Sequence, residues 1–271
     1  MFRVLDPSFH DLVAQDAKLE KLATGFEFTE GPVWSRRGYT LFSDVRASRI
    51  HKFEAGKTTV FRENSNRANG LTFDHQGRLL TCERGRVTRT EKNGSITVLA
   101  EKGLTAPNDL VYAIDAHIYF TDLLPRDASG PSTVYQITRK GELRVASREC
   151  EGPNGIALSA NQQRLFVADS RKSEIRMFDI HDDGSLSAGK VFATISERGP
   201  DGLKTDEGGN VWVAAPGGVW VFNAAGKHLG VIETPESPSN LSFGDGFRAL
   251  YITARTSLYH IRVKVAGTRT Y

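Results

Sequence analysis

Residues 154–169 read NGIALSANQQRLFVAD, and this stretch contains the pattern that decides the fold. An Asn-Gly pair opens an apolar segment, a polar turn follows at residues 160–163, and a second apolar segment ends at Asp169. Short apolar segments joined by tight polar turns are typical of antiparallel strands. The stretch therefore predicts a β-hairpin.

The same hairpin recurs along the chain every 39 to 47 residues. A polar residue opens each repeat, and the six openings are Glu30, Asn69, Asn108, Asn154, Asp201 and Asn240. The strand after the turn recurs as TLFSD, LLTCE, IYFTD, LFVAD, VWVAA and LYITA. A third strand follows in all six repeats and a fourth in five. Six four-stranded antiparallel meanders predict an all-β, six-bladed β-propeller, with an open pair of packed sheets as the alternative.

The sixth repeat has no clear fourth strand of its own. Residues 19–25, LEKLATG, precede the first repeat and belong to no blade. We expect this segment to supply the missing outer strand and so to close the ring. The chain is then one propeller domain, residues 1–271, with residues 1–18 as an N-terminal extension.

Composition and charge exclude several classes of protein. The 271 residues include 35 Lys and Arg and 32 Asp and Glu, a net charge of +3 without a long basic run. This gives no footprint for nucleic acid. Charged residues interrupt the N-terminal segment, and no apolar stretch is long enough to span a bilayer. We expect a cytoplasmic monomer or small homo-oligomer that binds no nucleic acid or membrane, with Cys82 and Cys150 as buried core thiols.

The first strand of each propeller blade lines the central channel, so the six opening residues should converge on one axis. They comprise two carboxylates and four amides, all with oxygen donors. Oxygen donors of this kind suit Ca²⁺, with Mg²⁺, Mn²⁺ or Zn²⁺ as alternatives. Asn-Gly pairs are also common turn residues. However, each repeat has a separate turn, so the sequence favours one divalent cation site in the channel.

Aspartates also end several of the second strands. Asp44, Asp122 and Asp169 occupy this position. We expect them to cap turns, or to pair with Arg46, Arg126 or Arg171, at the end of the blade away from the channel opening. Asp109 adjoins the opening residue Asn108, and we expect it to orient that residue.

The strings FTEGPVWS, RANGLTFDHQGRLLTCE, APNDLVYAIDAHIYFTD, GPNGIALSANQQRLFVADS and GPDGLKTDEGGNVWVA resemble the SMP-30/gluconolactonase family, and its bacterial gluconolactonases above all. The resemblance implies a six-bladed propeller with a divalent ion in its channel. It implies Glu30, Asn154 and Asp201 as metal ligands, Asn108 as a further ligand or substrate contact, and Asn69 in the pocket wall.

The resemblance also identifies departures at the rim of the pocket. Ala106 replaces an arginine that regucalcin-like members use to hold a sugar acid, and Arg84 replaces a histidine found in many gluconolactonase-like sequences. The loop 123–131 is long for its place in the repeat, and Asp127 is the nearest match to a substrate-contacting acidic side chain of the family.

The activity that the resemblance implies is hydrolysis of a small sugar lactone. A channel cation suits this chemistry, because it can polarise a carbonyl and activate water. Asp201 is the candidate general base, although a role as a metal ligand alone is equally open. Two other functions remain: phosphotriester hydrolysis on the same cation site, and a non-enzymatic binding propeller with a structural calcium.

Overall fold

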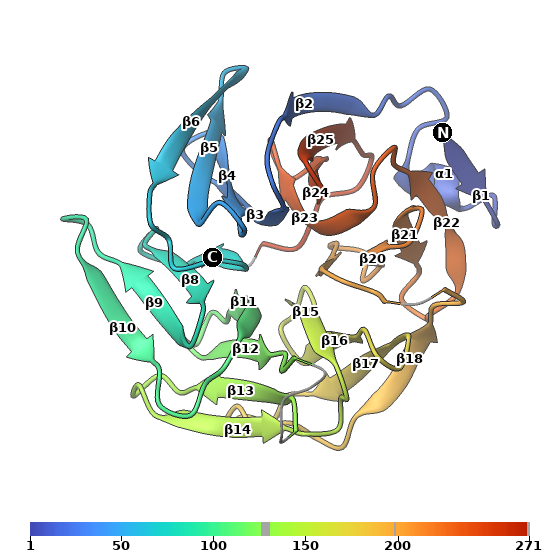
Figure 1. Ribbon diagram of the computed structural model, residues 1–271. Helices are drawn as coiled ribbons and strands as arrows, with labels where there is room; N and C mark the ends of the chain where they lie inside the picture. The colour runs from blue at the N-terminus through green and yellow to red at the C-terminus, as the bar shows by residue number, and fades with distance from the viewer. Residues whose placement is uncertain (126–130, 198, 270–271) are drawn as a thin grey trace.

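The computed structural model describes residues 1–125, 131–197 and 199–269. Six antiparallel sheets surround a central axis, and the chain passes from one sheet to the next around the ring (Figure 1). The predicted all-β, six-bladed propeller is confirmed. The strands follow the predicted repeats closely, because each repeat encodes its own alternation and its own turns.

The blades are numbered in the order of their first strands. Blade one contains β3 (Thr29–Ser35), β4 (Tyr39–Asp44), β5 (Arg49–Glu54) and β6 (Lys57–Arg62). Blade two contains β7 (Leu71–Phe73), β8 (Leu79–Glu83), β9 (Arg86–Thr90) and β10 (Ile96–Ala100). Blade three contains β11 (Pro107–Tyr112), β12 (Ile118–Asp122), β13 (Thr133–Ile137) and β14 (Leu143–Ser147).

The second half of the ring repeats this arrangement. Blade four contains β15 (Pro153–Leu158), β16 (Arg164–Asp169), β17 (Glu174–Asp179) and β18 (Lys190–Thr194). Blade five contains β19 (Leu203–Thr205), β20 (Val211–Ala215), β21 (Gly218–Phe222) and β22 (His228–Glu233). Blade six contains β23 (Pro238–Gly244), β24 (Ala249–Ala254), β25 (Ser257–Arg262) and the N-terminal strand β2 (Glu20–Thr24).

The N-terminal strand closes the ring as the sequence predicts. Strand β2 pairs antiparallel with β25, with partners running from Glu20 opposite His260 to Thr24 opposite Ser257. In Figure 1 this blue strand lies beside the red strands of blade six. The first and last segments of the chain therefore share one sheet, which ties blade six to blade one.

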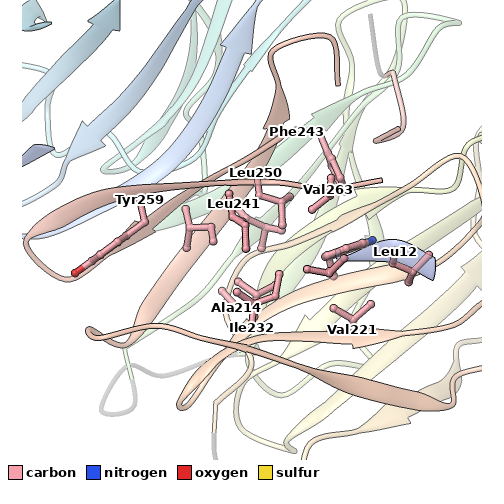
Figure 2. Close-up of a cluster of buried hydrophobic side chains, with 14 of the residues drawn as sticks. Leu12, Ala214, Val221, Ile232, Leu241, Phe243, Leu250, Tyr259 and Val263 are labelled. Atoms are coloured by element: carbon pink, nitrogen blue, oxygen red, sulfur yellow. The ribbon is translucent and has the colours of Figure 1, made fainter. Parts of the chain in front are cut away.

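The residues before β2 are also part of the propeller. Strand β1 (Phe2–Val4) pairs with β22 and gives blade five a fifth strand. The short helix α1 (Phe9–Leu12) places Phe9 in the apolar core between blades five and six, where it is fully buried. Figure 2 shows this core, with Leu12 beside side chains from both blades. This packing could not be predicted from the repeat pattern, because the segment lies outside the repeat.

Aspartates at the ends of second strands hold the loops that enter the channel. Asp44 accepts backbone N–H hydrogen bonds from Glu27 and Phe28, both at 3.0 Å. Asp122 and Asp169 accept equivalent pairs from the loops before blades three and four. The predicted capping role is correct, but the predicted location is wrong. In an antiparallel hairpin the end of the second strand lies beside the start of the first.

Two further expectations concern the cysteines and the membrane. Cys82 and Cys150 are free and buried, as predicted, and burial raises the pKa of the Cys150 thiol to about 12. Of the helices in the described ranges, none has the length and apolar character needed to cross a bilayer.

Candidate metal and substrate site

The opening residues converge at the end of the channel where the first strands begin, which we call the front end. There, adjacent blades are joined by their backbones. The N–H of Gly70 donates to the carbonyl of Asn108 at 2.7 Å. A Cβ atom on Gly70 would lie 2.6 Å from that same oxygen, and one on Gly155 would lie 2.3 Å from the carbonyl of Asp201. At these positions the glycine after the opening residue is therefore needed for close approach between blades rather than for a turn.

One of the six predicted openings is displaced by a residue. The N–H of Gly202 donates to the carbonyl of Ser239 at 2.7 Å, so Ser239 occupies in blade six the place of Asn108 in blade three. Asn240 takes the next position, where four blades have glycine. A proline precedes the opening residue in blades three to six, as in Pro238-Ser239. That shared proline is the sequence signal that would have set the correct phase.

Glu30 is fixed at the front end by hydrogen bonds to one of its oxygens. The side chain is 2% exposed, and its Oε2 accepts from the N–H of Gly31 at 2.7 Å and from Nδ2 of Asn240 at 3.2 Å. Burial, and to a lesser extent the charge of Asp109, raises the pKa of Glu30 to about 7. A carboxylate held in this way is costly unless a cation balances its charge.

Asp201 and Asn154 lie beside Glu30, as the sequence predicts. Burial, followed by the charges of Glu30 and Asp109, raises the pKa of Asp201 well above its usual range. A hydrogen bond from Asn154 acts in the opposite direction. Yet Oδ1 of Asn154 is buried and accepts no hydrogen bond from any described residue. An oxygen acceptor without a donor, next to two mutually repelling carboxylates, is the arrangement that a cation would complete.

The donor chemistry therefore fits a hard divalent cation such as Ca²⁺. Within the described ranges, no three His, Cys, Asp or Glu side chains are grouped so that they could hold a metal ion. The site instead combines two carboxylates, Glu30 and Asp201, with amide oxygens from Asn154 and Asn108. The two carboxylates would balance the charge of such a cation, and the amides would supply neutral oxygen ligands.

Glu30 contacts a group of polar side chains inside the channel, which we call the polar floor. It consists of Asp109, Asn240 and Lys204. The sequence analysis identified the first two of these residues but not Lys204. Nδ2 of Asn240 donates to Oδ2 of Asp109 at 3.2 Å, and Nζ of Lys204 lies 3.6 Å from that oxygen. Nζ also contacts Oδ1 of Asn240 at 3.4 Å. Asn240 thus joins Glu30 to the pair of opposite charges below it.

A cavity of about 410 Å³ opens at the front end next to the candidate ligands. Asn69 and Asn108, the residues predicted to bind substrate, form part of its wall. The Oδ1 atom of Asn69 is buried and unpartnered within the described part of the chain. Leu123 and Pro125 show that the long loop reaches this cavity. Asp127, the predicted substrate contact on that loop, lies outside the described residues.

Comparison with known proteins identifies the family. The model of the SMP-30/gluconolactonase/LRE-like region matches residues 28–256, most of the chain and all six blade openings. The chain belongs to this family. A gluconolactonase of Zymomonas mobilis is 27% identical, over 96% of this chain and 85% of the relative. A pentonolactonase of Haloferax volcanii is 27% identical, over 85% of this chain and 82% of the relative. The sequence prediction of a lactonase agrees with these relatives.

Solved structures extend the likeness to the whole propeller. A gluconolactonase of Xanthomonas campestris superposes with a TM-score of 0.89 and 30% identity, covering 97% of this chain and 94% of its own. Regucalcin from Agrobacterium tumefaciens superposes with a TM-score of 0.82 at 18% identity, covering 93% of this chain and 95% of its own. The second likeness concerns the fold alone.

Proposed function

We propose that this protein is a hydrolase that opens a small sugar lactone with the help of one divalent cation, Ca²⁺. One observation carries the proposal: Glu30, Asn154 and Asp201 converge at the front end of the channel, where Asn69 and Asn108 line a cavity of about 410 Å³. A cavity of this size suits a small ligand. The lactonase names of the family members cited above support the same reaction class.

The cation would be held by Glu30, Asn154 and Asp201, with Asn108 beside them. When bound, such an ion supplies Lewis-acid polarisation of a carbonyl and a more acidic water. We assign to Asp201 the role of general base, which accepts the proton of the attacking water. Its partial exposure gives water access, and a carboxylate placed beside the reacting water can accept that proton.

The remaining polar groups orient the substrate. Asn69 and Asn108 would hydrogen-bond the hydroxyl groups or the carbonyl of the lactone, and Asp127 remains the predicted contact from the long loop. Val45, Ala106 and Leu123 provide apolar surface against the carbon ring. A pocket with an apolar wall and a few directed polar groups is typical of small-molecule sites.

A pH-stat assay of gluconolactone and pentonolactone, with chelated and Ca²⁺-loaded protein, tests the proposal. We expect hydrolysis only with the cation. Paraoxon, assayed in parallel, tests the phosphotriester alternative, and faster turnover of paraoxon would favour that function. Tight binding of Ca²⁺ without turnover of any of these esters would favour a binding propeller with a structural ion.

Asp201→Asn separates the two roles of that residue. A general base contributes about 10²–10⁴-fold in rate, so its loss should reduce kcat by that factor even at saturating Ca²⁺, where the weaker cation binding expected from the loss of a ligand no longer limits the rate. Recovery of kcat at saturating Ca²⁺ would make Asp201 a ligand only.

A further inference from the structure

We propose that the preferred lactone carries a second acid group, a carboxylate or a phosphate, and that Arg67 and Arg84 hold this group. The inference rests on the proposed function and narrows its substrate class. It begins from the composition of the front cavity, whose described lining includes two arginines and no Asp or Glu.

Both arginines extend from backbone that is fixed beside the cavity. Arg67 lies two residues before Asn69, and its N–H donates to Oγ of Ser48 at 2.9 Å. The N–H of Arg84 donates to the carbonyl of Asn66 at 3.0 Å, and Nδ2 of Asn66 donates back to the carbonyl of Arg84 at 2.9 Å. The two loops of blade two are therefore tied together, and they present both arginines to one pocket.

Other arginines of blade two are paired, whereas these two are left available. Arg86 contacts Glu83 at 2.8 Å, and Arg78 contacts Asp74 at 2.7 Å. Neither Arg67 nor Arg84 makes an ion pair with a residue in the described ranges. Both side chains are exposed at the cavity. The blade thus neutralises its structural arginines and leaves two positive charges at the pocket.

Two guanidinium groups in one cavity favour an anionic ligand. Arginine binds carboxylates and phosphates through paired, charge-assisted hydrogen bonds. Positive charges lining a concave site also raise the local concentration of anions. A neutral aldonolactone needs hydrogen-bonding groups such as Asn69 and Asn108 but no positive charge. Ala106, which contributes only a methyl group to the wall, leaves recognition of the acid group to blade two.

Steady-state kinetics on three lactones tests the inference. The probes are glucono-1,5-lactone, which is neutral, glucaro-1,4-lactone, which carries a carboxylate, and 6-phosphoglucono-1,5-lactone, which carries a phosphate. We expect the Ca²⁺-loaded protein to prefer one of the two anionic lactones through a lower KM. Their comparison identifies which acid group is bound.

The variants Arg67→Gln and Arg84→Gln should each lower the preference for the anionic over the neutral lactone, measured as a ratio of kcat/KM. We expect a loss of about 10- to 100-fold, the range for a hydrogen bond to a charged group. Arg139→Gln removes an exposed arginine that follows β13 and is absent from the cavity lining, and it is the matched control, with no change expected.

The possible failures are distinguishable. Equal kcat/KM for neutral and anionic lactones, unchanged in both arginine variants, would overturn the inference and leave the proposed function intact. If no lactone is hydrolysed, the proposed function fails, and calorimetric titration with glucarate and with neutral glucitol decides the inference separately. Binding of glucarate that is weakened in both arginine variants supports the anion site, and its absence overturns it.

Discussion

The two ends of the central channel are lined by the same six first strands but by different kinds of side chain. At the front end, Glu30, Asn154 and Asp201 converge beside a cavity of about 410 Å³. At the rear end, a cavity of about 50 Å³ is lined mainly by apolar residues such as Val33, Leu110 and Leu158. The C-terminal segment also lies there, with the N–H of Thr268 donating to the carbonyl of Thr205 at 2.9 Å.

The difference between the two ends arises from the position along each first strand at which regular β-pairing begins. The first strands of blades one, three, four and six begin with an irregularity in pairing, for example between Pro107 and Leu110 in blade three. A bulge of this kind redirects a side chain, and here the opening residues lie toward the axis. Farther along, regular alternation places apolar side chains between blades. The candidate ligands are therefore gathered at the strand starts, and the rear cavity, whose lining also includes Lys204, is mainly a region of packing.

The difference between the two ends of the channel predicts the largest loss of activity for Glu30→Gln. This substitution preserves the size of the side chain but removes one of two carboxylates at the front end. We expect weaker cation binding and a loss in kcat/KM on the order of 1000-fold, more than the 10- to 100-fold typical of residues that only orient a ligand. Metal content and lactone kinetics measure the change, with circular dichroism to verify the fold. Glu142→Gln, an exposed position, is the control. Full activity with normal metal content would remove Glu30 from the site.

Lys204→Met should have the next largest effect, because it leaves Asp109 without the cation beneath the site. Breaking a buried ion pair typically costs 3–5 kcal/mol. Since the Lys204 side chain is 23% exposed, we expect about 3 kcal/mol, or a fall in Tm of about 9 °C. The double variant Asp109→Asn/Lys204→Met removes both charges and should recover most of that stability. If the double variant is as unstable as the single one, the charge pair is not what stabilises the floor.

The carboxylates at the front end should also make the stability of the protein depend on pH. In cation-free protein the folded Glu30, with its pKa raised to about 7 from 4.5, retains a proton that the unfolded chain releases. The contribution of Glu30 to the free energy of unfolding therefore falls as the pH rises from about 4.5 to about 7. Asp201, whose pKa is also raised, acts in the same direction. Since Ca²⁺ would replace the proton, we expect it to raise Tm by about 5 °C more at pH 8 than at pH 5.

Calorimetric Tm values with and without Ca²⁺ at both pH values measure this effect. The Glu30→Gln variant is the control and should flatten the dependence. If Ca²⁺ raises Tm by the same amount at pH 5 and at pH 8, these carboxylates do not bind the cation.

The smallest effect is expected at the rear end. A Cβ atom on Gly267 would lie 2.0 Å from the Phe243 ring, so Gly267→Ala should force the C-terminal segment to shift. We expect a loss of about 1 kcal/mol and about 3 °C in Tm, the lower end of the cost of overpacking. kcat/KM should stay within about twofold of the unmodified protein. A large loss of activity at unchanged stability would show that the rear end takes part in the chemistry.

The sequence by itself determined the blades, the ring closure and most of the candidate site. Strand alternation and turn residues are local properties, and each repeat contains both in its own sequence. Strands such as β16 and β25 therefore lie where the pattern predicts them. Because the openings recur at one position of the repeat, the sequence placed Glu30, Asn154 and Asp201 together with the other opening residues at the channel, although 171 positions separate the first of these three from the last. The family resemblance then selected these three as ligands.

Only the tertiary structure decided which residues occupy the second layer and the ends of the channel. The exchange of Ser239 for Asn240 as the opening of blade six depends on which carbonyl accepts from Gly202 of the neighbouring blade. Lys204 and Phe9 acquire their partners through contacts between blades, and these contacts leave no periodic trace in the chain. The sequence of a repeat encodes the strands and turns inside one blade. The packing of one blade against the next depends on how closely their backbones approach, and this distance is set only when the ring closes.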